Sequence, residues 1–500
     1  MWPSRTEQRF SLEHGCQPLQ SWKAKWPLGL DMLSRAVKRS EDMQMLRFFV
    51  EVAEESGSTF EQHLLGSRGV NTVDPRNIQA ILSTKSEDYC LGVRVLSFTP
   101  LLGSGIFTQD GTAWKHSREL FGPQFACNNL QNFEQVKGHV QDLMNSVPED
   151  GIVDLQPLCF KLSLDNTMSL IFGDSVSAMD WGQESEFEKA FDIAQDYITR
   201  RARLGPYYWF LNGKKFRDAC KTCHHFVDKA VARALATSTR TNRSTGEGKN
   251  NDGKVGHALI DFLAQQMKEP QIIRDQCMNL LLAGRDTTGC CLQWAFRLLA
   301  RHQHVLGRLR TEIEQTLGLG ADAHPPTRDD LKKMTYLNLV IKEGTRPTPD
   351  CDNILRLYPS VPANSRQATR LTTLPVGGVP DGMSPVLVRP GETVAYCVYA
   401  MHRRKDIYGE DAGQFRPERW EGDELKGVGF AYLPFHGGPR QCLGQEFALM
   451  QVSYTVARMV QVFPIMEAPG TEPEVEVGME KQNLTLVVSS ADGCVVSLRS

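Results

Sequence analysis

The chain has 500 residues, of which 41% are hydrophobic and 23% are charged, a balance typical of an ordinary globular protein. Lys and Arg number 56 against 59 Asp and Glu, so the formal net charge of -3 excludes the broad basic surface of a nucleic-acid-binding protein, and we expect no nucleic-acid partner. The 13 cysteines are scattered and odd in number, which favours reduced core residues over a disulfide scaffold.

The first 40 residues contain charges such as Arg5, Glu7 and Arg9, and we identify no signal peptide in them. No apolar run anywhere in the chain approaches the roughly 20 residues that a membrane-spanning helix needs. The sequence opens on Trp2-Pro3 without a periodic element. We therefore interpret residues 1–40 as an N-terminal segment whose upstream part is missing.

Residues 40–300 carry mostly helical periods, with apolar side chains at steps of three and four residues from Met43 onward. The stretch 237–256 has no aromatic residue and only one large apolar residue, which predicts a flexible surface linker between helices. A long helical pattern follows over 272–302. At 1.5 Å per residue it would span about 45 Å and cross a whole domain.

After Leu371 the pattern becomes that of short strands, over 385–388 and 393–399. Two further apolar runs, 485–488 and 495–498, are separated by an Asp-Gly pair and predict a β-hairpin. The sequence therefore predicts a mostly α fold with small β-sheets, arranged as a single large domain over residues 41–500.

Two motifs that occur in cofactor proteins have simpler interpretations here. Residues 318–323 fit a relaxed dinucleotide-binding pattern, but a helical run precedes them and prolines follow, so we interpret Gly318 as a helix stop. Cys220-x-x-Cys223-His224 has the spacing of c-type haem attachment. It also lies on a helical period without an export signal, which favours a buried helix face, and a c-type electron carrier remains the third hypothesis for the function.

The strongest motif runs from Phe435 to Gly444, reads FHGGPRQCLG and precedes a helical run. If Cys442 binds an iron, the glycines would let the backbone approach a flat macrocycle, and N–H groups at the helix start would stabilise a thiolate. Arg440 would offer a cation to a propionate. A plain glycine-rich turn around a buried cysteine does not explain so many matched positions in one short segment.

This segment resembles the haem-binding signature F-x-x-G-x-R-x-C-x-G of the cytochrome P450 family. The resemblance implies the mostly α P450 fold, haem b (iron protoporphyrin IX) as cofactor and Cys442 as the iron ligand, with Phe435, Arg440 and Gly444 in the cofactor site. W-x-x-x-R at Trp114 and Arg118 resembles the family helix whose Trp and Arg meet the haem propionates.

A second family motif lies within the long predicted helix. The segment AGRDTT at 283–288 resembles the motif whose acid and alcohol deliver protons to bound dioxygen, which implies this role for Asp286 and Thr287. Glycine, aspartate and threonine all have low helix propensity, so their presence in a helix interior indicates that these residues serve a function and do not stabilise the helix. The alternative is a solvated polar face.

The family's Glu-x-x-Arg pair is interrupted in this chain. Arg356 is the expected arginine, and Arg419 lies in a segment whose arginine joins that pair in the family, but position 353 is Asn. Removing residues 344–353 would restore the match with Glu343, so we infer an insertion there, which a gene-model error and real biology explain equally well. Its prolines oppose a continuous helix, so Glu343 meets both arginines only if the insertion loops out.

Short segments at 14–16, 207–211 and 357–366 resemble the fungal alkane- and fatty-acid-hydroxylating branch of the family. The resemblance implies a monooxygenase that inserts one oxygen atom from O2 into a C–H bond of a hydrophobic substrate, at the terminal carbon of an n-alkane or fatty acid. Electrons would come from NADPH through a separate cytochrome P450 reductase, for which Lys115 and Arg440 would form part of a basic docking face.

Members of that branch carry an N-terminal membrane helix, so we expect a missing anchor and a location on the cytoplasmic face of the endoplasmic reticulum membrane. The aromatic cluster 207–211 is interpreted as an apolar lip at the membrane surface or at the substrate channel, or equally as ordinary helix-end core. The alternative function is a haem-binding homologue disabled by the insertion between Glu343 and Arg356. The exact substrate, the regiochemistry and the oligomeric state stay open.

Overall fold

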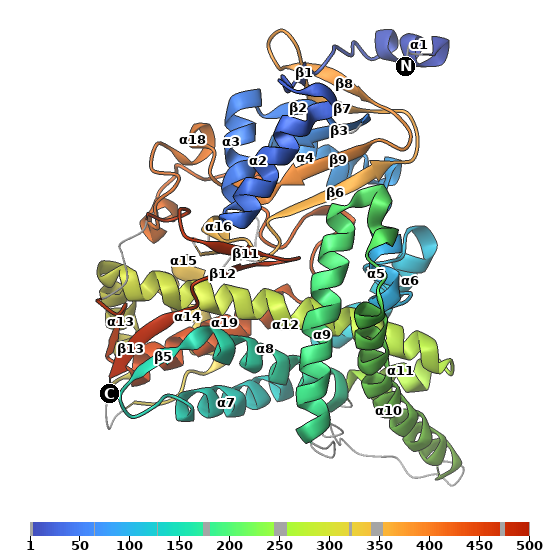
Figure 1. The fold of residues 1–500 in the computed structure, drawn as a ribbon. Helices are drawn as coiled ribbons and strands as arrows, with labels where there is room; N and C mark the ends of the chain where they lie inside the picture. Colours follow the sequence, from blue (N-terminus) through green and yellow to red (C-terminus); the bar gives the residue numbers. More distant parts are fainter. Residues whose placement is uncertain are drawn as a thin grey trace.

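Helices dominate the computed structural model and the strands are short, which confirms the predicted mostly α fold with small sheets (Figure 1). Within the described ranges, no helix is both long enough and apolar enough to cross a membrane. The structure describes residues 4–64, 66–127, 129–173, 181–244, 258–319, 323–341, 354–470 and 476–499.

The long predicted helix is α12, which runs across the molecule at the centre of the helical part (Figure 1). The helices are α1 (Arg5–Glu13), α2 (Leu30–Glu41), α3 (Met45–Ser56), α4 (Pro75–Gln79), α5 (Arg94–Leu102), α6 (Gly111–Cys127), α7 (Asn129–Asn145), α8 (Leu155–Phe172), α9 (Trp181–Arg203), α10 (Lys214–Ser244), α11 (Leu259–Gln266), α12 (Pro270–Arg301), α13 (Gln303–Leu317), α14 (Arg328–Lys333), α15 (Thr335–Ile341), α16 (Ile354–Leu357), α17 (Val398–Met401), α18 (Lys405–Tyr408) and α19 (Gln445–Val462). Since these helices cover α12 on all sides, most of its residues are buried.

Helix α12 joins two apolar cores. Its first half, up to Leu282, packs in a cluster with side chains of α9, α10 and α11, and its second half, from Cys291, packs with α13, α15 and α19. Between them, Gly284 lies so close to α8 that a Cβ atom there would come within 2.4 Å of the Thr167 hydroxyl. The glycine in the middle of the helix is therefore needed for packing.

The strands form four small sheets. The largest has the order β1-β2-β3-β9-β6-β4 and lies with α2 and α3 at the end of the molecule where the chain begins (Figure 1). The strands are β1 (Gln20–Ser21), β2 (Thr59–Leu64), β3 (Ser67–Thr72), β4 (Tyr89–Cys90), β5 (Ile152–Asp154), β6 (Ala363–Ala368), β7 (Thr372–Gly378), β8 (Ser384–Val388), β9 (Thr393–Cys397), β10 (Ile465–Glu467), β11 (Gln482–Leu484), β12 (Val488–Ser490) and β13 (Val495–Arg499). The strand predicted over 393–399 ends at Cys397, where α17 begins.

The predicted C-terminal hairpin is wrong, because its two strands belong to different sheets. Strand β12 pairs with β11, whereas β13 pairs antiparallel with β10 and β5. The turn between them is fixed by a distant segment: the Cys494 N–H donates to the Asp154 carboxylate at 2.7 Å, and the Leu155 N–H donates to the Cys494 carbonyl. The chain therefore leaves β12 toward β5 instead of folding back.

Two further segments are more helical than predicted. Helix α10 continues to Ser244, so residues 237–244 of the predicted linker are helical; the hydroxyls of Thr237 and Thr239 donate to carbonyls four residues earlier, which satisfies them within the helix. Residues 245–256 lie outside the described part. Near the start of the chain, Ser4 and Glu7 form a capping box at α1, a signal that is visible in the sequence.

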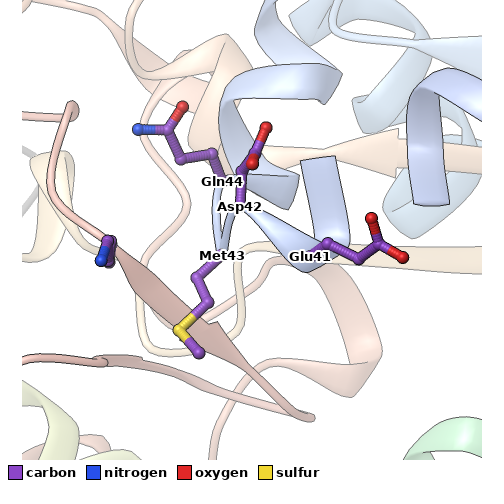
Figure 2. A pocket seen from close by; sticks show the side chains of 5 residues that line it. Glu41, Asp42, Met43 and Gln44 are labelled. Carbon is purple, nitrogen blue, oxygen red and sulfur yellow. The ribbon is translucent and has the colours of Figure 1, made fainter. Parts of the chain in front are cut away.

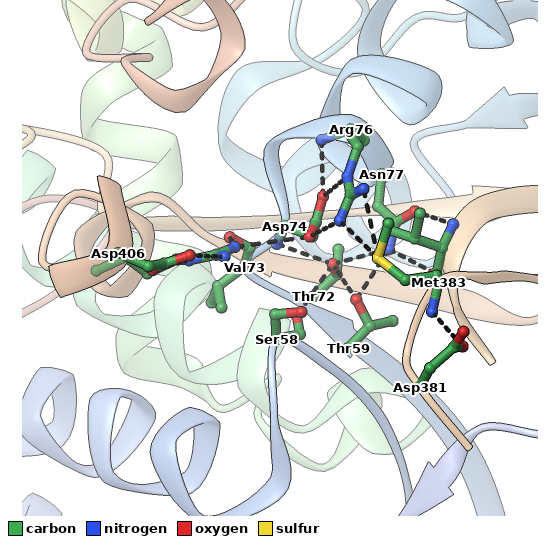
Figure 3. Close-up of polar contacts among 12 residues, drawn as sticks. Ser58, Thr59, Thr72, Val73, Asp74, Arg76, Asn77, Asp381, Met383 and Asp406 are labelled. Atoms are coloured by element: carbon green, nitrogen blue, oxygen red, sulfur yellow. Dashed lines mark hydrogen bonds and ion pairs between the residues drawn. The ribbon is translucent and has the colours of Figure 1, made fainter. Parts of the chain in front are cut away.

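A buried amide ties α4 to two sheets (Figure 3). Asn77 is fully buried; its side-chain N–H groups donate to the hydroxyls of Thr59 and Thr72 and to the Val376 carbonyl, and its oxygen accepts from the Val376 N–H at 3.1 Å. Helix α4 leads directly into the π-helical segment Ala80–Thr84, which contacts the candidate site described below. The network therefore sets the position of one wall of the site.

We expect Asn77→Ala to destabilise the fold by about 3 kcal/mol, because it leaves several buried donors and acceptors without partners. The measurement is the temperature of thermal inactivation. Asn71→Ala is the matched control: its side-chain N–H group has no hydrogen-bond partner, so we expect less than about 1 kcal/mol. Equal losses in the two variants would contradict the assigned role of Asn77.

Candidate functional site

The loop 435–444 leads into α19, and Gly444 is the N-cap of that helix. The Cys442 N–H donates to the Phe435 carbonyl at 3.0 Å, which closes the loop. Among the described cysteines, Cys442 is the one whose side chain is exposed to solvent. Surrounding protein nevertheless raises the pKa of its thiol, opposed by the Gly444 N–H and by the charge of Arg118. The latter two groups stabilise the thiolate form that a metal requires.

The loop rests on the protein's own backbone at Gly438. This glycine has φ +69°, and a Cβ atom there would lie 1.9 Å from the Leu82 carbonyl oxygen in the π-helical segment. The contact with Leu82 therefore requires a glycine at position 438. The prediction from the sequence was that this glycine lets a macrocycle approach the backbone. At Gly444 a Cβ atom would meet only the Phe125 ring, at 3.7 Å. The role predicted for Gly444 at a cofactor stays a prediction.

The three predicted propionate-binding residues come together. Trp114 and Arg118 lie one turn apart on α6, and the guanidinium of Arg440 lies 4.3 Å from the centre of the Trp114 ring. Arg118 donates to the Gln441 carbonyl at 2.7 Å, one residue before Cys442. Arg440 donates to the Asp110 carboxylate at 2.7 Å. Two loops and one helix therefore place these side chains beside the cysteine.

Two arginines that the sequence interpretation missed join this group. Arg94 from the start of α5 and Arg366 from β6 both donate to the side-chain oxygen of Asn364, at 2.6 and 3.2 Å. Burial, assisted by the charges of Arg366 and Arg440, lowers the pKa of Arg94 to about 9. Neither residue lies in a spacing motif. Only the tertiary fold brings the two side chains together at Asn364. We call Arg94, Arg118, Arg366 and Arg440 the arginine cluster.

The arginine cluster fits a ligand that carries carboxylates. Burial first, and then the neighbouring Arg366 and Arg118, lower the pKa of Arg440 to about 10, although Asp110 opposes the change. The Nε of Arg94 is buried and has no hydrogen-bond partner. Crowded cations with an unused donor favour an anion between them. Together with a solvent-accessible thiol, this donor set fits haem b, which carries an iron and two propionates.

The second motif lies at the centre of α12. Asp286 is buried, and its carboxylate accepts a hydrogen bond from the side chain of Gln195 on α9. The neighbouring Arg285 forms an ion pair with Asp192, also on α9, at 2.5 Å. Burial raises the pKa of Asp286 more than Arg285 lowers it. The Thr287 hydroxyl donates to the Ala283 carbonyl at 2.7 Å. In the described structure no hydrogen bond joins Asp286 to Thr287.

Arg356 and Arg419 lie side by side. Both donate to the Gln414 carbonyl, and Arg419 also pairs with Asp411 at 3.1 Å. Arg356 is fully buried and donates further to the carbonyls of His402 and Ala412. The proposed partner of the two arginines, Glu343, and the insertion 344–353 lie outside the described residues.

The described residues agree with the simpler interpretations of the two cofactor-like motifs, a buried helix face at 220–224 and a helix stop at Gly318. Cys220 and Cys223 are buried on α10 in an apolar cluster, and burial raises the pKa of Cys220 to about 12. The ring Nε2 of His224 lies 2.8 Å from the Leu101 carbonyl. Helix α13 ends at Gly318 with φ +74°, as expected of a helix stop, and residues 320–322 lie outside the described part.

Comparisons with known proteins agree with the motifs. The family model described as "Cytochrome P450" matches residues 25–490. A protein named "Cytochrome P450" from Arthroderma benhamiae is 54% identical over 99% of this chain and 94% of its own length. "Cytochrome P450 52A5" from Candida maltosa is 39% identical over 90% of this chain and 84% of its own, and "Cytochrome P450 monooxygenase g430" from a Fusarium species is 37% identical over 98% and 86%.

Proposed function

The chain belongs to the cytochrome P450 family of haem monooxygenases, and on that premise we propose that it hydroxylates the terminal carbon of an n-alkane or a fatty acid. Two arguments support this substrate class. Similarity to proteins named cytochrome P450 52 extends over most of the chain. Segments such as 357–366 resemble the fungal branch that oxidises alkanes and fatty acids.

The observation that carries the proposal is the solvent-accessible Cys442 thiol beside the arginine cluster. In our proposal its Sγ ligates the haem iron, and Phe435 and Gly444 contact the macrocycle. Trp114 and the four arginines hold the propionates. Bound there, haem would activate dioxygen for insertion into a C–H bond. Asp110 already holds Arg440 in place, so this cation is oriented before the cofactor binds.

Asp286 and Thr287 would manage protons in this scheme. The raised pKa of the Asp286 carboxyl lets it keep a proton at higher pH than an exposed carboxyl does, and the Gln195 side chain holds it in place. The Thr287 hydroxyl donates a hydrogen bond to the Ala283 carbonyl at rest, so it must turn toward a new acceptor to pass its proton on. Ser360 donates to the Thr287 carbonyl at 2.8 Å, which steadies the backbone at this position.

The test of the proposed function is turnover of hexadecane and hexadecanoate by the purified chain with NADPH and a cytochrome P450 reductase. We expect a product hydroxylated at the terminal carbon. We expect Thr287→Ala to lower product formation about 10²-fold while oxygen consumption continues, because the proton relay is lost. Thr287→Ser should restore most of the coupling. Unchanged coupling in the Ala variant would contradict the relay.

The electron donor is proposed to be a separate NADPH-dependent reductase. Lys115 is exposed on α6 and is available for a docking face. Arg440 is not, because its side chain is only 20% exposed and is engaged by Asp110 and Trp114. The docking role expected for Arg440 is therefore corrected: its cation lies near the other arginines of the cluster, Arg366 and Arg118.

We propose that the enzyme works at the cytoplasmic face of the endoplasmic reticulum membrane. In the segment Gly205–Phe210, the side chains of Tyr207, Trp209 and Phe210 are exposed, and the last two stack at 3.9 Å. Leu12 of α1 is 83% exposed. Exposed aromatic and aliphatic side chains of this kind favour contact with a membrane surface over ordinary helix-end core.

The alternative of a disabled homologue has no support in the described residues. Arg356 and Arg419 keep several carbonyl partners and lie next to each other on Gln414. Similarity to the Arthroderma protein extends over 99% of the chain.

A further inference from the structure

His436 follows Phe435 in the loop 435–444 and adopts an uncommon backbone conformation. Its φ is +62°, in the left-handed region that a residue with a side chain rarely occupies. Strain of this kind persists only where surrounding contacts hold the residue in place. The contacts of the His436 side chain therefore have to supply that support.

The imidazole of His436 lies against a cross-strand pair of the largest sheet. Asn364 of β6 and Tyr396 of β9 are direct antiparallel partners, so their side chains leave the same face of the sheet. The Nε2 atom of His436 lies 3.2 Å from the Asn364 side-chain nitrogen and 2.9 Å from the Tyr396 hydroxyl. One ring nitrogen therefore joins the loop 435–444 to two neighbouring strands.

The orientation of the Asn364 amide determines where the imidazole carries its proton. Its side-chain oxygen accepts hydrogen bonds from Arg94 at 2.6 Å, from the Ser365 N–H at 2.8 Å and from Arg366 at 3.2 Å. All three groups can only donate, so the atom that faces His436 is the amide nitrogen, which also can only donate. Nε2 is therefore the acceptor, and the proton of the neutral ring lies on Nδ1.

The surroundings of His436 keep its ring neutral. Burial first, and then the charges of Arg366 and Arg94, lower the pKa of His436 to about 3. A protonated ring would have no lone pair on Nε2 and would place a further charge beside two cations. His436 therefore supplies an acceptor for the amide of Asn364 without adding a positive charge to the arginine cluster.

Asn364 connects His436 with two cations of the arginine cluster. Arg366 lies two residues further along β6, on the same face of the strand, and Arg94 reaches Asn364 from the start of α5. The hydrogen bond that closes the loop, from the Cys442 N–H, ends at the residue just before His436. A chain of hydrogen bonds therefore links the loop of the thiol to two arginines on other elements.

We propose that His436 is a positioning residue of the haem site, an inference that rests on the proposed function. By accepting the Asn364 amide N–H, it fixes Arg94 and Arg366 relative to the loop that carries Cys442. The iron ligand and these cations for the propionates then keep a set separation before haem binds. His436 acts through Asn364 in this proposal, so its effect lies in how tightly haem is held and how easily it is reduced.

The test measures how fast haem leaves the protein. Ferric enzyme is mixed with excess apomyoglobin, haem transfer is followed in the Soret region, and the midpoint potential of the bound haem is measured separately. We expect His436→Ala to speed the transfer roughly 10- to 100-fold, as loss of an outer hydrogen bond does at metal sites. The midpoint potential should fall, because displaced cations stabilise an added electron less. His436→Asn, whose side chain keeps an acceptor oxygen, should restore part of both properties.

His436→Gly separates the hydrogen bond from the backbone strain. Glycine adopts a positive φ without cost, but it offers no acceptor to Asn364. We expect haem to leave this variant at least as fast as it leaves His436→Ala. Haem retention at the wild-type level in the Gly variant would show that the imidazole is not needed.

A double variant tests the route through Asn364. If His436 acts through this amide, its removal has little left to change once Asn364 is replaced by alanine. We expect His436→Ala to alter the transfer rate less than about threefold in the Asn364→Ala background. An undiminished effect of His436→Ala in that background would overturn the proposed route.

Gln44→Ala is the control for a general loosening of the fold. The Gln44 side chain also joins segments far apart in the sequence, because it donates to the Met479 carbonyl at 3.1 Å. It lines a surface hollow of about 380 Å³ together with Lys481 (Figure 2), and its partners Arg39 and Met479 belong neither to the loop 435–444 nor to the arginine cluster. We expect this variant to lose some thermal stability and to keep the wild-type transfer rate and midpoint potential.

Each protein is first shown to give the thiolate-type band of the ferrous carbon-monoxide complex, so that transfer is measured from a folded haem site. If His436→Ala lacks the band, His436→Asn and His436→Gly carry the same comparison. Wild-type transfer rates in the His436 variants, or equal acceleration in Gln44→Ala, would overturn the inference and leave the proposed function standing. A wild-type chain without the band would remove the proposed haem site together with its positioning residue.

Discussion

Replacing Cys442 with serine is expected to abolish the thiolate-type Soret band of the ferrous carbon-monoxide complex and to end monooxygenase activity. Among the described cysteines it is the solvent-exposed one, and both Arg118 and the Gly444 N–H favour its thiolate. A serine hydroxyl is a far weaker donor to iron than a thiolate. Difference spectroscopy of the reduced protein, with and without carbon monoxide, measures the result.

Cys16→Ser is the control for this variant, because Cys16 is only partly buried and lies outside the candidate site. It should retain the band at full height. A thiolate-type band that survived in Cys442→Ser would move the iron ligand to another cysteine and would remove the central assignment of the proposed function.

The second large effect is expected at Gly438. An alanine there would combine a positive φ with a Cβ atom 1.9 Å from the Leu82 carbonyl oxygen, so the loop or the π-helical segment must move. We expect a loss of at least about 3 kcal/mol of stability and poor haem retention. The measurements are the haem content of the purified protein and its thermal inactivation.

Gly427→Ala separates the two causes. Gly427 has φ +78°, but a Cβ atom there would meet nothing within 4 Å, so this variant carries the backbone strain without the collision. We expect a cost of roughly 1 kcal/mol and normal haem content. Similar defects in the two variants would show that the contact with Leu82 is unimportant.

The sequence predicted those features of the fold that depend on local pattern. The period over 272–302 corresponds to α12, and Trp114 and Arg118 lie beside Arg440, which is far away in the chain, as their motifs indicated. In each case a helical period or a spacing motif carried the information.

The errors arose where distant partners decide the structure. Strand β13 pairs with β5 and β10, which no local hairpin pattern reveals. No spacing motif marks Arg94 or Arg366, and only the tertiary fold brings both to the side chain of Asn364. Arg440 was expected to face a redox partner as well as the cofactor, but its pairing with Asp110 turns it inward.

The pairing of β13 also sets the order in which the protein can be completed during synthesis. The hydrogen bond between Cys494 and Asp154 joins residues 340 positions apart, and β13 contributes the last described strand of the chain. A ribosome must therefore synthesise β13 before β5 and β10 gain their common partner. Until then both strands have unpaired edges, and such edges are sites at which a nascent chain can pair with other chains and aggregate.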